Sequence, residues 1–143
     1  IQGTKLTVNN FNKYSKIFLP LLIKLSKHYK CAIRVHPRES LKIVLDFFRT
    51  INERKAKDDK VEIIKARNKL EGLSKNTKVC IFDHPHSTLF WQAKANGINT
   101  ILLSDEDFNN INYKLIKLYD LVLNINDKDT FTKINNFIKN LCY

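Results

Sequence analysis

Glycine is scarce in this chain of 143 residues and occurs only at Gly3, Gly72 and Gly97. The phosphate-binding loops of dinucleotide-binding proteins and of P-loop ATPases need closely spaced glycines, in the patterns GxGxxG and GxxxxGK[ST]. Neither pattern is present in the sequence. The scarcity of glycine therefore argues strongly against a standard dinucleotide-binding site and against a P-loop NTPase.

Cysteine is equally sparse, and its three residues, Cys31, Cys80 and Cys142, lie far apart in the chain. An odd number of separated cysteines without a CxxC pair indicates buried thiols in a reducing compartment, not a disulfide framework. Long apolar runs are also missing. The longest, IFLPLLI at 17–23, falls well short of the roughly 18 residues of a membrane span. These absences predict a cytoplasmic protein.

The chain is long enough for one globular domain, and 43% of its residues are hydrophobic. It begins at Ile1, and its first residues show no basic-then-apolar signal pattern. We therefore expect residues 1–143 to form a single domain that is a fragment of a longer protein.

Positive charge dominates, with a formal net charge of +11, and it is unevenly distributed. Residues 1–78 contain 19 Lys and Arg against 7 Asp and Glu, whereas residues 79–143 contain 6 against 7. A basic first half is typical of a solvated face, or of a surface that meets an anionic ligand or anionic lipid headgroups. Nucleic acid is the less favoured partner, because the lysines are scattered and no aromatic stacking platform lies among them.

The hydrophobic pattern alternates between strand-like and helix-like segments. Strands are expected at 31–37, 61–64, 78–83, 99–104 and 120–125, although a helix through 58–74 fits the second nearly as well. Helices are expected at 14–29, 40–54, 67–76, 87–96, 109–119 and 127–141, with Ser15 and Ser40 as N-caps and Gly97 just past the end of the fourth. Such alternation predicts an α/β fold, a three-layer sandwich with a mostly parallel sheet covered on both faces.

Ligands of parallel sheets bind beyond the carboxyl ends of the strands, and polar residues follow two of the expected strands. One set is His36, Pro37 and Arg38, where the arginine can bind a phosphate through two hydrogen bonds. The other is DHPHST, which comprises Asp83, His84, Pro85, His86, Ser87 and Thr88. The two sets can face one crevice of a doubly wound sheet.

The second set allows three interpretations. Ser87 and Thr88 open a helix, where unpaired N–H groups and the positive end of the dipole favour phosphate. The same hydroxyls can simply cap the helix, and Asp83 can simply bind the following turn. A metal-dependent hydrolase would use Asp83, His84 and His86, with His36 as a further ligand. No second ligand cluster supports that third interpretation, so the pattern favours phosphate and no bound metal.

Two motifs extend the phosphate interpretation to a family. RVHP, at a strand end, and IFDHPHSTLFWQAKANGINTILL, about 45 residues later, resemble the C-terminal half of GT-B bacterial surface-carbohydrate transferases. Relatives of that group include the CDP-glycerol glycerophosphotransferases and bacterial sialyl- and polysialyltransferases. They resemble this chain in an HP motif after one strand and in an acidic residue followed by a Ser/Thr pair before a helix. In the tail of that helix, Gln92 replaces the family's acid and Asn99 its proline.

The resemblance implies a Rossmann-like, donor-binding domain of a glycosyltransferase or glycerophosphotransferase in capsule or other surface-polysaccharide synthesis. It implies a nucleotide-activated donor, CMP- or CDP-linked, and no metal cofactor. His36, Pro37 and Arg38 would contact the donor, Ser87 and Thr88 its phosphate, and Asp83 and His84 would shape the loop. The partners implied are an N-terminal acceptor domain of the same protein and the inner face of the membrane. No catalytic residue is assigned. A non-catalytic α/β binding or regulatory module remains the alternative.

Overall fold

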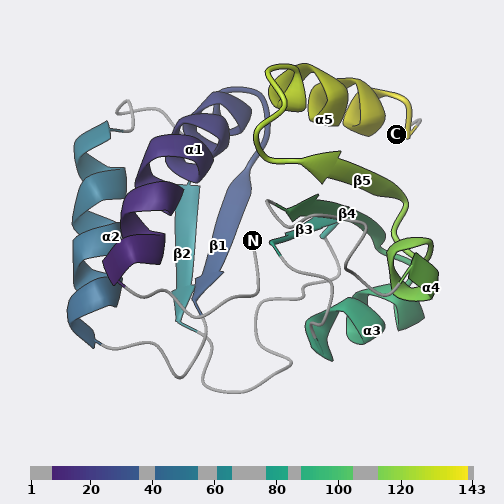
Figure 1. Cartoon of the computed structure of the whole chain (residues 1–143), viewed down its shortest axis with the longest axis horizontal. Helices are drawn as coiled ribbons and strands as arrows, with labels where there is room; N and C mark the ends of the chain where they lie inside the picture. Colours follow the sequence, from purple (N-terminus) through teal and green to yellow (C-terminus); the bar gives the residue numbers. More distant parts are fainter. Residues whose placement is uncertain are drawn as a thin grey trace. The chain divides into compact units, whose positions relative to one another are not determined.

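The computed structural model describes residues 8–35, 41–54, 61–65, 77–83, 88–104 and 113–141. Helices and strands alternate through these ranges, and every described pair of neighbouring strands is parallel. The predicted α/β class is therefore confirmed (Figure 1). The chain divides into two compact units, which we call the N-terminal unit (Lys5–Arg67) and the C-terminal unit (Asn68–Tyr143). The strands form one sheet in each unit.

The N-terminal unit contains one strand–helix–strand repeat preceded by a helix. Its elements are α1 (Val8–Ser26), β1 (Cys31–Val35), α2 (Leu41–Arg54) and β2 (Val61–Lys65). The two strands pair in parallel, with Cys31 opposite Val61 and Val35 opposite Lys65. The strand prediction for 61–64 is thus confirmed over the helical alternative. Two strands alone bury little, so helices that pack on them must complete the core, and α1 contacts both α2 and β1.

Helix α1 is longer than the sequence pattern predicted. It begins at Val8, so Ser15 lies inside the helix and the predicted N-cap there is wrong. Its buried side chains, Phe18, Leu19, Leu22 and Leu25, recur at the three- and four-residue spacing of one helix face. Pro20 lies within the helix but is exposed. Helix α1 therefore has one apolar face in the core and a polar face in solvent.

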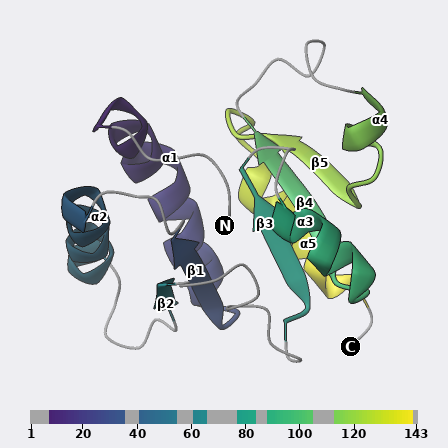
Figure 2. The ribbon, with the colours of Figure 1, turned by 90° about the horizontal axis from the view of Figure 1, so that it is seen from below.

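The C-terminal unit contains two consecutive strand–helix–strand repeats and a closing helix. Its elements are β3 (Val79–Phe82), α3 (Thr88–Ala95), β4 (Asn99–Ser104), α4 (Tyr113–Ile116), β5 (Leu121–Asn124) and α5 (Thr130–Lys139). The strand order is β3-β4-β5, all parallel. Figure 2 shows α3 on one face of this sheet and α5 on the other. This is the predicted Rossmann-like, three-layer arrangement. The expected helix at 67–76 and the first residues of that at 109–119 lie outside the described residues.

Aromatic packing fills the α3 face of the C-terminal sheet. Phe82 and Leu102 are neighbours in register, and residues of α3 and of the α4 region pack on them. The rings of Phe90 and Tyr119 stack with centroids 4.1 Å apart, and Phe82 meets both edge-on at 6.0 and 5.9 Å. We call Phe82, Phe90 and Tyr119 the aromatic cluster. On the opposite face, Ile101 and Leu103 are fully buried, as is Ile134 of α5.

The connection from α3 to β4 ends the helix in a Schellman motif, as the position of Gly97 predicted. Gly97 has a φ of 69°, which only glycine adopts without strain. The Gly97 N–H donates to the Lys94 carbonyl at 3.1 Å, and the Ile98 N–H donates to the Ala93 carbonyl at 2.9 Å. Ile98 packs against the core that contains Ala93. These contacts fix the direction in which the chain enters β4.

The amino ends of β4 and β5 are joined by a side-chain contact. Oδ2 of Asp120 accepts a hydrogen bond from the Thr100 N–H at 2.8 Å and another from the Thr100 hydroxyl at 3.3 Å. The Asp120 N–H in turn donates to the Thr100 carbonyl at 3.0 Å. Thr100 is fully buried, so these bonds satisfy polar groups that water cannot reach.

Candidate functional site

The candidate site lies at the carboxyl edge of the β3-β4-β5 sheet. Because the three strands are parallel, their carboxyl ends, Phe82, Ser104 and Asn124, share one edge. Ser104 stands opposite Asn124, and Phe82 stands opposite Leu102, so β4 extends two residues past the end of β3. Ligands of parallel α/β sheets bind at this edge.

Asp83 follows the last residue of β3 and is buried, with 7% of its surface exposed. Its negative charge acts on the hydroxyl of Tyr119 in the aromatic cluster. Burial first, and the charge of Asp83 second, raise the pKa of Tyr119 far above its usual value of 10. Tyr119 is therefore a neutral phenol at all physiological pH values. The sequence interpretation placed Asp83 correctly at the strand end but gave no sign of its link to Tyr119.

Helix α3 begins at Thr88, five residues after Asp83. The first four N–H groups of a helix lack partners within the helix, and the dipole adds a partial positive charge there. The first turn of α3 contains no acidic residue that would oppose an anion. Leu89, Phe90 and Ala93 are buried and hold the helix on the sheet. The amino end of α3 is thus anchored near the carboxyl end of β3, as the DHPHST pattern predicted.

The ends of β4 and β5 add polar groups that the sequence interpretation did not single out. Ser104 is 1% exposed, and its carbonyl accepts a hydrogen bond from the Ile125 N–H at 3.0 Å. The side-chain oxygen of Asn124 accepts a hydrogen bond from the Asn126 N–H at 2.9 Å, and so stabilises the turn that follows β5. Thr130 bonds the same turn, donating to the Asp127 carbonyl at 2.8 Å. Applying the strand-end rule to NTILLS would have identified Ser104.

Gln92 occupies the position at which the resembled family carries an acid, on the second turn of α3. Its Oε1 atom is buried and has no hydrogen-bond partner in the described part of the chain. A buried acceptor without a donor costs free energy. The side chain therefore has unused capacity to accept a hydrogen bond.

The other predicted site residues, His36, Pro37, Arg38, His84 and Ser87, lie outside the described residues, as does His86. Strand β1 ends at Val35, so His36 follows a strand end as expected. The structure does not test whether the two strand ends face one crevice. Among the described residues, no group of three or more His, Cys, Asp or Glu is placed to hold a metal ion. That observation does not extend to the histidines of the metal hypothesis.

The two described cysteines are not part of this site. Cys31 and Cys80 are half-buried free thiols. Burial raises the pKa of Cys31 to about 11 and also raises that of Cys80. Cys80 packs against the hydrophobic core that contains the aromatic cluster. Both thiols are protonated near neutral pH, which agrees with the predicted structural role.

No protein-family profile, curated protein or solved structure matches the chain. The family resemblance therefore depends on the two motifs alone and stays a prediction. Within the described residues, no helix is both long and apolar enough to cross a membrane.

Proposed function

We propose that the C-terminal unit binds the phosphate of a nucleotide-activated donor, as part of a GT-B-like transferase for surface-polysaccharide synthesis. The observation that carries this proposal is that α3, whose first turn contains no acidic residue, is the element after β3 in a parallel sheet. In such sheets ligands bind at the carboxyl edge, and anions favour the amino end of a helix.

The amino end of α3 would hold the donor phosphate through its unpaired N–H groups, with the hydroxyls of Ser87 and Thr88 as further donors. Charge that develops on the departing phosphate during transfer would be stabilised by the same groups. Donors fixed by a helix need no reorganisation when that charge appears. Helix α3 suits this role because Leu89, Phe90 and Ala93 hold it rigidly on the sheet.

Asp83 takes a different role in this proposal, because a carboxylate repels a phosphate. Its burial at the end of β3 suits a residue that shapes the segment after the strand, a role that the resemblance also implies for His84. His36, Pro37 and Arg38 follow β1 of the N-terminal unit and would contact the nucleotide or its phosphate. The donor would be CMP- or CDP-linked, and the chemistry would need no bound metal.

Calorimetric titration of the chain with cytidine, CMP and CDP tests this function. Because phosphate contacts dominate, affinity should rise in that order. The double variant Ser87→Ala, Thr88→Ala should weaken CDP binding about tenfold, the effect of losing one or two charge-assisted hydrogen bonds. Thr132→Ala removes an exposed hydroxyl from α5 and is the matched control. If CDP does not bind, or if the double variant binds it as tightly as the parent chain, the proposal is wrong.

Two further measurements separate the alternatives. A non-catalytic module would bind CDP but transfer nothing when the chain is joined to its acceptor domain. A metal-dependent hydrolase using Asp83, His84 and His86 would retain zinc or manganese on purification, and Asp83→Asn would release it. Metal analysis of the purified chain therefore decides between a phosphate site and a metal site.

A further inference from the structure

We draw no further inference here: the strongest candidate, the solvent-exposed indole of Trp91 on α3, carries nothing, because nothing in the described part of the chain shows what covers it.

Discussion

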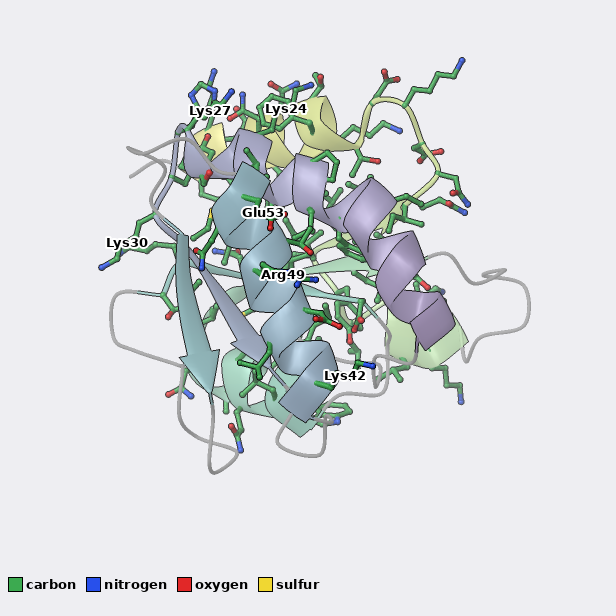
Figure 3. All side chains as sticks on the ribbon, turned by 90° about the vertical axis from the view of Figure 1, so that its left-hand side faces the viewer. Lys24, Lys27, Lys30, Lys42, Arg49 and Glu53 are labelled. Carbon is green, nitrogen blue, oxygen red and sulfur yellow. The ribbon has the colours of Figure 1, made fainter. Side chains whose placement is uncertain are left out.

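The two units of the chain are built from the same strand–helix–strand repeat but differ in what they bury and what they expose. The C-terminal unit has three strands, helices on both faces of its sheet and a stacked aromatic cluster. The N-terminal unit has two strands, and its buried side chains among the described residues come from α1. Lys24, Lys27 and Lys30, in the last turn of α1 and in the connection after it, are exposed (Figure 3).

This difference shows how one repeat can serve two purposes. A second repeat adds a third strand, and with it a longer carboxyl edge at which polar groups can gather around a ligand. A single repeat offers a shorter edge. Single substitutions can measure how far the C-terminal unit depends on its core, its strand-end contacts and its turns.

The largest expected effect is at the aromatic cluster. Phe90→Ala should lower the free energy of unfolding by about 3–5 kcal/mol, because Phe90 is fully buried and touches both other rings. Urea unfolding followed by circular dichroism measures the loss. Trp91→Ala, at a neighbouring side chain that is 55% exposed, should cost under about 1 kcal/mol. Similar losses in both variants would contradict the described core.

The next effect is at the amino ends of β4 and β5. Asp120→Ala removes the acceptor for the N–H and hydroxyl of the buried Thr100 and should cost about 1–3 kcal/mol. Asp129→Ala removes an equal charge from the start of α5, where the side chain makes no capping hydrogen bond. That control should cost about 0.5 kcal/mol by the helix-dipole effect alone. If Asp129→Ala lowered the free energy of unfolding as much as Asp120→Ala, the loss would come from the removed charge and not from the hydrogen bonds to Thr100.

Alkaline pH should weaken the C-terminal unit through Tyr119. Because folding raises the pKa of Tyr119 above its usual value of 10, the folded chain keeps a proton that the unfolded chain loses. The resulting stability is complete below pH 10 and falls as the pH rises above it, by at most about 1.4 kcal/mol per pH unit. Urea midpoints between pH 8 and pH 11 should therefore fall less steeply in Tyr119→Phe than in the parent chain. Parallel slopes would disprove the burial of this hydroxyl.

The smallest effect is at the turn after α3. Gly97→Ala should cost about 1 kcal/mol, since a φ of 69° strains any side chain. A Cβ at this position meets nothing within 4 Å, so the cost comes from the backbone alone. Gly97→Asn should cost less, because asparagine tolerates this conformation. Thermal unfolding of the two variants should rank them in this order, and the reverse order would contradict the Schellman motif.

The sequence predicted those features that depend on local pattern. The strands VCIF and NTILLS, the helix between them and the left-handed Gly97 all follow from apolar runs and turn chemistry within a few residues. The amino end of α3 followed from the same reasoning. Local patterns were less clear where helix propensity is weak. Helix α1 begins at Val8, but the asparagines in its first turns made the sequence pattern predict a later start.

Features that depend on contacts between distant residues could not be predicted. The link between Asp83 and Tyr119 spans 36 positions, and that between Thr100 and Asp120 spans 20. Each requires segments that are distant in the sequence to pack side by side, which no local pattern specifies. The division of the strands into a two-stranded and a three-stranded sheet could not be predicted either, because strand order depends on long-range packing.

The exposure of Trp91 has a practical consequence. It is the only tryptophan of the chain, it lies on α3 three residues after Thr88, and its ring centroid is 5.1 Å from that of Phe90. Its fluorescence therefore reports on the C-terminal unit without any label. An anion bound at the first turn of α3 would alter the field across the indole and shift its emission. One emission spectrum can thus show whether the first turn of α3 has bound an anion.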